Sequence, residues 1–309
     1  MAGLFLGVFI GNYSGSSGNK LTHFLANQII FPTPAPKVDQ RIRIVAAGDM
    51  LLGRSINFRM VRDNNFNWPF EKVADFLREA DFSFVNLEGP LVEDCPLTQT
   101  GMVFCGDRRA ASGLVFAGVD ACNLTNNHIL NYGEDGLKQT IDVLSQNNIG
   151  AFGEEKILRK NIKGVNFSFL GFNEVGLGNR AYERLLLDVA DKIKQEKEFS
   201  DAVVVSFHWG NEYTEDISPR QKQLGYLAID SGADIVVGHH PHWVQSKEIY
   251  KDKPIYYSLG NFVFDQMWSQ KTREGLIVSF EFEGKNLLGE KEFPVLIEDF
   301  GQPRFIGEN

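Results

Sequence analysis

The stretch DIVVGHHPHW, residues 234–243, joins a short apolar run to a cluster of imidazoles. The β-branched run predicts a buried strand, and three of the six histidines of the chain follow it directly. His240 and His242 flank Pro241, and residues two apart in an extended or turn segment can face the same side. Proline removes a donor and stiffens the loop. The spacing therefore predicts two imidazoles held toward one metal ion, with His239 directed elsewhere, as a supporting or surface group.

Four other strand candidates end in polar residues in the same way. Each apolar run finishes in a carboxylate, an amide or an imidazole, and five of the six histidines lie in three of these clusters. In open α/β sheets, ligands bind at the carboxyl ends of the strands. Imidazole, amide and carboxylate together suit zinc, manganese or iron better than calcium. The strand-end residues are Asp49, Asn86, Glu88, Asn126, Asn127, His128, His208, His239, His240 and His242.

Helix and strand patterns alternate along the chain, and strands dominate toward its end. This order predicts an α/β sandwich and not a purely doubly wound sheet. Ser218 and Pro219 form a cap and a first helical position. The expected strands are 42–46, 82–85, 165–172, 202–207, 235–237 and three runs after residue 254; the expected helices are 70–80, 133–146, 182–198 and 218–230; the run 114–119 leads into 121–124.

The charge balance excludes one class of partner. The net charge is -9, and no basic stripe interrupts the acidic residues, so general nucleic-acid binding is not expected. An anionic substrate would have to be held by a metal or by local positive groups. Arg54 and Arg220 are the candidates for such anion clamps, and solvated surface arginines are the other interpretation.

Residues 1–40 are expected to form a segment separate from a domain over residues 41–309. The apolar run 2–10 is too short to span a bilayer, which needs about 20 residues. A weak or clipped membrane anchor and a plain tail both remain open. Polar small residues at 11–19 and the proline-rich stretch 31–37 are typical of a linker and a spacer.

The three cysteines form no CxxC pattern, so zinc bound through thiolates is not expected. Cys95 and Cys105 flank a short loop and could pair if the protein is exported. Three buried thiols are the other interpretation.

Six segments, in order, resemble the calcineurin-like metallophosphoesterase superfamily, and more closely its CapA-type branch of poly-gamma-glutamate capsule biosynthesis. The resemblance covers about residues 42–278 and implies an α/β (α+β) fold, a four-layer α-β-β-α sandwich of the metallo-dependent phosphatase type. It also implies one or two divalent transition metal ions, manganese, zinc or iron, at the strand ends. The segments are GDMLLGR (48–54), NLEGPL (86–91), TNNHILNYGEDGL (125–137), HWGNEY (208–213), GHHPHWVQ (238–245) and YSLGNFVFD (257–265).

Carried over position by position, the resemblance implies a role for each of these polar residues. His128 is the implied catalytic acid, which protonates the leaving group. The implied metal ligands are Asp49, Glu88, Asn127, His208, His240 and His242. Substrate contacts are expected from Arg54, Asn86, Asn126, His239 and Asn261.

The chain departs from the superfamily at three positions. The first motif is Asp-x-His in the superfamily, whereas Leu51 stands at the histidine position here. Glu88 replaces a bridging aspartate, and Ile129 replaces the acid that normally follows the third-motif histidine. Metal number and catalytic competence therefore stay open.

Two hypotheses for function follow, and a vestigial site in a plain α/β domain is a third. The first is a metal-dependent hydrolase of capsule biosynthesis that acts on a phosphoester or a gamma-glutamyl amide. The second is a non-catalytic, membrane-tethered accessory that binds an anionic polymer during its synthesis or export. Both place the protein in the cell envelope, membrane-anchored or extracytoplasmic, with membrane-bound capsule-synthesis partners.

Overall fold

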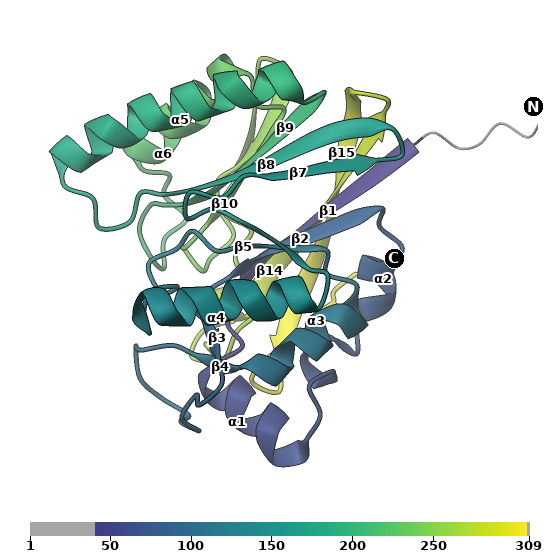
Figure 1. The fold of residues 1–309 in the computed structure, drawn as a ribbon, viewed down its shortest axis with the longest axis vertical. Helices are drawn as coiled ribbons and strands as arrows, with labels where there is room; N and C mark the ends of the chain where they lie inside the picture. The colour runs from purple at the N-terminus through teal and green to yellow at the C-terminus, as the bar shows by residue number, and fades with distance from the viewer. Residues whose placement is uncertain (1–40, 308–309) are drawn as a thin grey trace, which may run out of the picture. The chain divides into compact units, whose positions relative to one another are not determined.

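The computed structural model describes residues 41–307, so the expected N-terminal segment, its apolar run and its linker lie outside the described residues. Two β-sheets face each other, and helices cover the outer face of each sheet (Figure 1). This is the four-layer α-β-β-α sandwich that the resemblance implies. The division of the chain at residue 40 stays a prediction.

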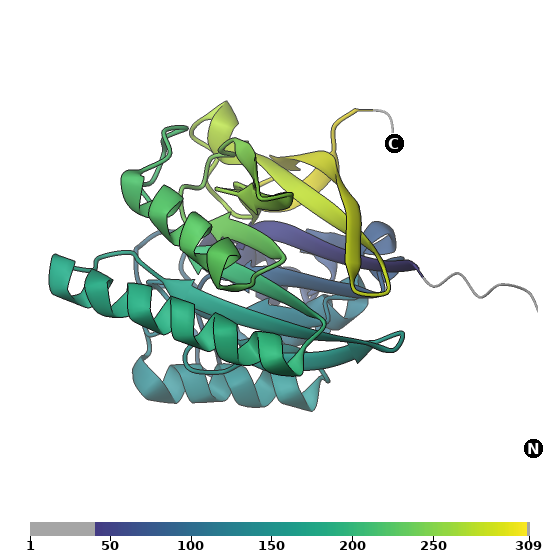
Figure 2. The same ribbon diagram turned by 90° about the horizontal axis from the view of Figure 1, so that it is seen from above.

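The larger sheet has eight strands in the order β16-β15-β14-β1-β2-β5-β6, with β13 paired to β1. The strands β1, β2, β5 and β6 run parallel, and the C-terminal strand β14 pairs antiparallel with β1. Figure 2 shows the C-terminal strands, in yellow, beside the purple β1. The bounds are β1 (Arg41–Met50), β2 (Phe82–Leu87), β5 (Ala121–Asn123), β6 (Gly150–Phe152), β13 (Asn261–Val263), β14 (Glu274–Glu283), β15 (Asn286–Glu298) and β16 (Gln302–Phe305).

The smaller sheet has six strands in the order β11-β12-β10-β9-β8-β7. Its centre is parallel, and every residue of β9 is buried, as expected for a parallel strand covered on both faces. The bounds are β7 (Leu158–Ile162), β8 (Val165–Asn173), β9 (Ala202–His208), β10 (Ile235–His239), β11 (Lys247–Tyr250) and β12 (Lys253–Tyr256); a separate pair is β3 (Leu91–Val92) with β4 (Gly106–Asp107).

Helices α1 to α4 cover the larger sheet and helices α5 and α6 the smaller one (Figure 1). No helix within residues 41–307 is long and apolar enough to cross a membrane. The bounds are α1 (Arg54–Asp63), α2 (Ala74–Arg78), α3 (Ala111–Ala117), α4 (Gly133–Gln146), α5 (Asn179–Phe199), α6 (Pro219–Ser231) and α7 (Gln270–Arg273), with 3-10 turns η1 (Trp68–Phe70) and η2 (Arg108–Ala110).

Strand alternation sorts side chains into separate cores. In β1, Ile42 and Ile44 face the layer between the sheets, whereas Val45 faces the helices. Phenylalanines fill the inter-sheet layer: the Phe169 ring stacks on Phe82 with the centroids 4.7 Å apart. The apolar alternation seen in the sequence is therefore what separates the layers.

One expected helix differs from the structure, and one apolar run without an assigned element is a helix. The predicted helix 70–80 is shorter: a 3-10 turn ends at Phe70, and α2 begins only at Ala74. Phe70, Val73 and Leu77 are all buried, so packing keeps the apolar spacing although the backbone leaves helical geometry at Val73. The run 114–119, for which the sequence indicated only that it leads into 121–124, lies mostly in α3, because its apolar residues pack onto the larger sheet.

Candidate metal centre

Strand register lines up polar side chains across the larger sheet. Asp49 in β1 lies opposite Asn86 in β2 and Asn261 in β13, and Asn86 lies opposite Asn123 in β5. Gly48 makes this possible, because a Cβ there would lie 2.1 Å from the carbonyl oxygen of Gly260. One carboxylate and three amides thus share one row, near the carboxyl ends of β1, β2 and β5 and at the amino end of β13.

The smaller sheet contributes imidazoles to the same region. His208 at the end of β9 lies opposite His239 at the end of β10. The backbone N–H of His240 donates to Asp49 Oδ2 at 3.1 Å, which ties this sheet to β1. The strand ends therefore belong to two sheets, and the centre forms where the two sheets meet.

The loop around Pro241 holds two histidines in uncommon backbone conformations. His240 and His242 have φ angles of 94° and 58°, in the left-handed region that side chains other than glycine rarely adopt. Such conformations cost about 1–3 kcal/mol each and concentrate at functional sites. Both side chains are buried, with 5% and 2% of their surface exposed. The loop therefore keeps both rings inside at an energetic cost.

Asp49 is the most heavily contacted carboxylate of the centre. It is fully buried, and its oxygens lie 3.3 Å from His239 Nδ1, 3.2 Å from His242 Nδ1 and 2.9 Å from Asn86 Nδ2. Burial raises the pKa of Asp49, but the contacts with His239 and His242 outweigh it and hold the pKa well below its ordinary value. The group is therefore a carboxylate at neutral pH.

Glu88, unlike Asp49, accepts no hydrogen bond from the described residues and has a raised pKa. It is fully buried, and neither of its carboxylate oxygens has a hydrogen-bond partner among residues 41–307. The nearest ring nitrogens are His242 Nε2 at 3.6 Å and His128 Nε2 at 3.9 Å. Burial raises the pKa of Glu88 to about 8. A buried carboxylate that accepts no hydrogen bond is costly to ionise, so a cation beside Glu88 would stabilise its charged form.

Asn261 fixes the orientation of the His242 ring. The Asn261 amide nitrogen donates to Gln266 Oε1 at 3.0 Å and to the Thr272 carbonyl at 2.8 Å, so its oxygen must be the acceptor. That oxygen lies 2.9 Å from His242 Nδ1, which therefore carries a proton. In the neutral ring, Nε2 is then the free nitrogen, and it faces Glu88. Burial lowers the pKa of His242, but the charges of Glu88 and Asp49 raise it to about 9.

His208 and Asn127 bring two ligand-type atoms together, since His208 Nε2 lies 2.9 Å from Asn127 Oδ1. Burial holds the pKa of His208 well below its ordinary value and lowers that of His240 to about 3. Both rings are therefore neutral at pH 7, which is the form that binds metals.

The residues present fit a divalent metal ion. His240 Nδ1, like both Glu88 oxygens, is buried and has no hydrogen-bond partner in the described part of the chain. Ligand atoms of Asp49, Glu88 and His242 lie within 4.8 Å of one another, and so do those of Glu212, His240 and His242. A mixed set of nitrogen and oxygen donors suits manganese, iron or zinc.

His128 lies beside this cluster in a fixed orientation. Its ring stacks on Phe104 with the centroids 3.9 Å apart. Asn131 Oδ1 accepts from the Phe104 backbone N–H at 2.7 Å and lies 3.1 Å from His128 Nδ1. Nδ1 is therefore the protonated nitrogen, and Nε2 faces Glu88. Burial lowers the pKa of His128.

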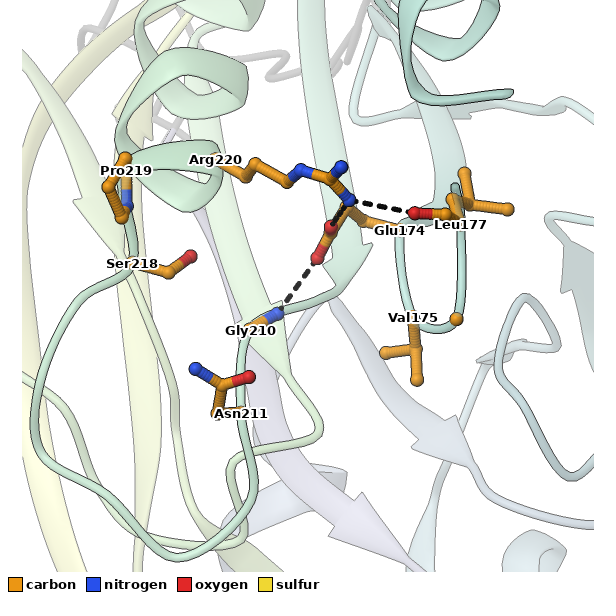
Figure 3. Close-up of a pocket in the computed structure, with 9 residues that line it drawn as sticks. Glu174, Val175, Leu177, Gly210, Asn211, Ser218, Pro219 and Arg220 are labelled. Atoms are coloured by element: carbon orange, nitrogen blue, oxygen red, sulfur yellow. Dashed lines mark hydrogen bonds and ion pairs between the residues drawn. The ribbon is translucent and has the colours of Figure 1, made fainter. Parts of the chain in front are cut away.

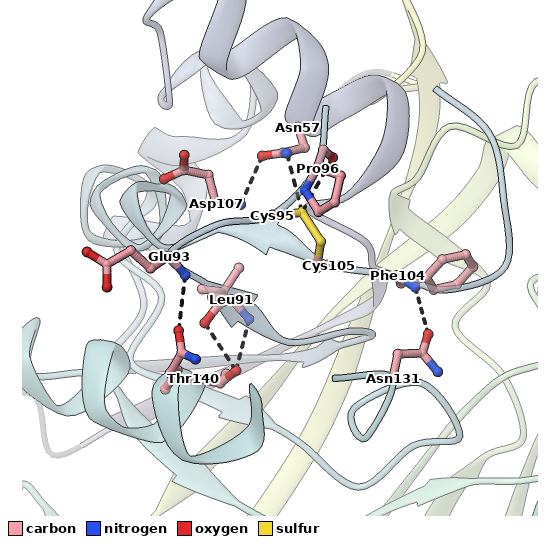
Figure 4. The surroundings of a disulfide bond; sticks show 11 residues. Asn57, Leu91, Glu93, Cys95, Pro96, Phe104, Cys105, Asp107, Asn131 and Thr140 are labelled. Atoms are coloured by element: carbon pink, nitrogen blue, oxygen red, sulfur yellow. Dashed lines mark hydrogen bonds between the residues drawn. A yellow bond between two sulfur atoms is a disulfide. The ribbon is translucent and has the colours of Figure 1, made fainter. Parts of the chain in front are cut away.

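A disulfide joins Cys95 and Cys105 at the base of the loop that carries Phe104 (Figure 4). Of the two interpretations of the cysteines, pairing is therefore the one that the structure shows. Cys122 is a buried free thiol, and burial raises its pKa. The crosslink fixes one end of the segment that packs against His128.

The residues expected to contact substrate are mostly buried among the ligand candidates. Asn126 donates to the Leu87 carbonyl at 2.8 Å and accepts from the His128 backbone N–H at 3.1 Å. Asn86 and Asn261 are equally buried and hydrogen-bonded, so these three amides position the cluster. Of the two alternatives for His239, the surface group is wrong and the supporting group agrees with the structure: His239 is fully buried beside Asp49, because β10 carries it between the sheets.

The two candidate anion clamps are already paired with carboxylates. Arg54, only 10% exposed, forms an ion pair with Asp265, and its guanidinium lies 4.7 Å from the centroid of the Phe104 ring. Arg220 pairs with Glu174 at 2.9 Å beside a pocket of about 550 Å³ (Figure 3). Both guanidinium groups are thus ion-paired within the protein, and their contact with an anion stays a prediction.

The chain matches a family model over most of these elements. The model described as "Bacterial capsule synthesis protein PGA_cap" covers residues 43–266. The chain belongs to this family. All six segments that carry the resemblance, from residue 48 to residue 265, lie within the matched range.

Relatives of the PGA_cap chain carry similar descriptions. It is 31% identical over 289 residues to "Capsule biosynthesis protein CapA" of Bacillus anthracis, covering 86% of this chain and 70% of that protein. It is 32% identical over 263 residues to "PGA biosynthesis protein CapA" of Bacillus subtilis (strain 168), covering 79% and 68%. A hypothetical protein from Thermus thermophilus, of known crystal structure, has a TM-score of 0.52 at 17% identity over 82% of this chain and 98% of that one, which supports the fold alone.

One residue of this PGA_cap centre was absent from the predicted ligand set. Glu212 lies in the segment HWGNEY, four positions after His208, and its carboxylate lies within reach of His240 and His242. A third carboxylate beside a predicted histidine ligand was the available signal. Asn123, Asn131 and Phe104 were also missed, because their contacts depend on the tertiary fold.

Proposed function

We propose that this PGA_cap protein is a metal-dependent hydrolase of capsule-polymer biosynthesis that cleaves a phosphoester or a gamma-glutamyl amide. The descriptions of its relatives, capsule and PGA biosynthesis proteins, support the pathway. The observation that carries the chemistry is Glu88, buried without a hydrogen-bond partner in the described chain and lying between His128 and His242. We propose that the centre binds one or two divalent metal ions.

Some residues of the centre are candidate metal ligands, and others orient those ligands. Asn261 orients His242, and Asn86 contacts both Asp49 and His208. A bound divalent metal supplies Lewis-acid chemistry, because it makes water more acidic and stabilises negative charge on a reacting oxygen. The residues that would hold it are Asp49, Glu88, Asn127, His208, His240 and His242.

His128 is the residue placed to move a proton. Asn131 holds Nδ1, so Nε2 is the nitrogen directed toward the metal-binding cluster. A protonated Nε2 can donate to a leaving group, a contribution of typically about 10²–10⁴-fold in general acid catalysis. Because burial lowers the pKa of this imidazole, its protonated form is confined to lower pH.

A second candidate function rests on Leu51. This side chain is buried with Phe104 and Phe264, and an apolar side chain supplies no ligand at the position of the superfamily histidine. A centre short of one imidazole could bind metal and polymer carboxylates without turnover. The protein would then be a membrane-tethered accessory that binds an anionic polymer.

We place either function in the cell envelope, membrane-anchored or extracytoplasmic, with membrane-bound capsule-synthesis partners. The Cys95–Cys105 disulfide supports this location, because disulfides persist in oxidising compartments. The proposed substrate or ligand is an anionic polymer or a phosphoester.

The test is an assay of the full chain loaded with manganese, zinc or iron. Substrates are bis(p-nitrophenyl) phosphate and a gamma-glutamyl oligomer, and each variant is also analysed for bound metal. His128→Ala is expected to keep metal and lose turnover, whereas the exposed Leu130→Ala keeps both. Full turnover in His128→Ala contradicts the role of His128. Polymer binding with no turnover in any metal-loaded form favours the accessory function.

A further inference from the structure

We propose that Glu212 is a direct metal ligand that replaces the imidazole absent at Leu51. This inference rests on the proposed metal-dependent function and adds to the predicted ligand set. It implies a centre with three carboxylates, which is suited to a hard divalent cation such as Mn²⁺.

The side chain at the position of the superfamily histidine, Leu51, is buried among apolar residues. Leu51 is 1% exposed and belongs to an apolar cluster with Phe104, Phe264 and Ile297. No rotation of this side chain can supply a donor atom. Phe264 of this apolar cluster packs against His242, with the ring centroids 4.8 Å apart, so a further ligand beside His242 has to come from another segment.

Glu212 lies in the loop after β9. This loop is held in place by the residue that follows Glu212, Tyr213. The Tyr213 backbone N–H donates to the Pro241 carbonyl at 2.9 Å, and the Tyr213 ring stacks near His242 with the centroids 5.9 Å apart. The loop also turns tightly at Gly210, which has a φ of 80° and where a Cβ would lie 2.6 Å from the Gln221 side chain. The loop around Glu212 is thus fixed against the histidine loop.

Three ligand atoms converge there. A carboxylate oxygen of Glu212 and ring nitrogens of His240 and His242 lie within 4.8 Å of one another. His240 Nδ1 is buried and has no hydrogen-bond partner within residues 41–307. An unpartnered imidazole nitrogen with a carboxylate nearby is the arrangement that a cation between them would satisfy.

The replacement changes the chemistry of the donor set. Exchanging an imidazole for a carboxylate adds an oxygen donor and a negative charge. With Asp49 and Glu88, Glu212 makes three carboxylates, so the ligands offset most of the charge of two divalent ions. Carboxylate donors suit manganese, whereas imidazole suits zinc and copper. Glu212 should therefore contribute more to Mn²⁺ affinity than to Zn²⁺ affinity.

The experiment titrates the full metal-free chain with Mn²⁺ and with Zn²⁺ by calorimetry. Glu212→Gln keeps the shape of the side chain and is expected to weaken Mn²⁺ binding by about tenfold or more, with a smaller loss for Zn²⁺. The matched control is Glu215→Gln, three positions along, whose carboxylate is 63% exposed and pairs with Lys271. This control should bind both ions as the wild type does.

A second readout separates ligation from a charge effect at a distance. The visible absorption of the Co²⁺-loaded protein reports ligand identity, so Glu212→His should change its spectrum and raise the Zn²⁺ preference. Unchanged Mn²⁺ affinity in Glu212→Gln together with an unchanged Co²⁺ spectrum in Glu212→His overturns the inference but leaves the proposed function standing. Absence of Mn²⁺, Zn²⁺ and Fe²⁺ binding by the wild type overturns both.

Discussion

At the residue scale, amides determine how the imidazoles of this centre are oriented. An amide whose nitrogen is committed elsewhere can only accept at its oxygen, and that choice fixes which ring nitrogen carries the proton. Asn261 does this for His242, and Asn131 does it for His128. Orientation by such partners commonly decides the affinity of a metal site.

Replacing Asn261 by alanine tests this arrangement. We expect metal affinity to fall by about 10–100-fold, because the His242 ring loses the acceptor that orients it. The unfolding free energy should fall by about 1–3 kcal/mol, since the Thr272 carbonyl also loses a donor. Calorimetric titration and urea unfolding measure the two effects, with the exposed Asn211→Ala as control. Wild-type affinity in Asn261→Ala would show that other contacts orient the ring.

Protons should compete with metal at Glu88 and His242. Their pKa values are raised to about 8 and about 9, and the value of His242 depends on the negative charge of Glu88, so the metal-free pair retains one or two protons at neutral pH. Metal binding must displace these protons, so affinity should rise as pH rises toward those values and fall as pH drops. Calorimetry in buffers of different ionisation enthalpy counts the protons released. No proton release at neutral pH would contradict the raised pKa values.

At the element scale, the loop between Cys95 and Cys105 connects a crosslink to the catalytic candidate. Phe104 precedes Cys105, and its backbone N–H donates to Asn131 Oδ1 (Figure 4). The Phe104 ring stacks on His128, which shares the Asn131 acceptor. The Arg54 guanidinium also packs over the Phe104 ring. The loop therefore stabilises the fold and also fixes the position of His128.

The double variant Cys95→Ser/Cys105→Ser measures this contribution. For cysteines separated by 10 residues, the loss of the crosslink should lower the unfolding free energy by about 2–3 kcal/mol. Turnover should fall while metal content is unchanged, because the loop contacts His128 and not the ligand candidates. Dithiothreitol should reproduce both effects in the wild type and change nothing in the variant. Equal stability of reduced and oxidised protein would refute the assignment.

At the scale of the whole molecule, the centre exists because two sheets are packed together. Asp49 and Glu88 come from the larger sheet, and His208 and His239 come from the smaller one. The phenylalanines between the sheets keep these strand ends together. Phe169 of β8 lies among them, with its ring centroid 5.6 Å from that of Phe84 and 5.9 Å from that of Phe152.

Phe169→Ala should therefore weaken the packing between the two layers. A buried phenylalanine exchanged for alanine costs about 3–5 kcal/mol, and this ring contacts both sheets. The exposed Leu187→Ala on α5 should change the unfolding free energy by no more than about 0.5 kcal/mol. Urea unfolding measures both, and metal titration of the folded Phe169→Ala fraction should show weaker binding. A loss below about 1 kcal/mol would mean that Phe169 does not join the sheets.

The sequence by itself determined most of the helices and strands and most of the polar side chains that the site contains. The spacing of apolar residues predicted α4, and the Ser218 cap helped to predict α6, each with nearly the observed bounds. Both signals are local properties of the sequence. The strand ends also named most of the polar groups that meet at the centre. The shortened α2 and the helix α3 were not predicted, because packing on the sheet decided their backbone.

Only the tertiary structure decided which of these groups face one another. The sequence could not show that the strand ends belong to two sheets, that His239 is buried, or that Asn86 and Asn261 position ligands. The position of Glu212 near His208 in the sequence was a signal, but its approach to His240 depends on how two loops pack. The physical reason is that local sequence sets periodicity and conformation, whereas sheet pairing across long separations sets proximity.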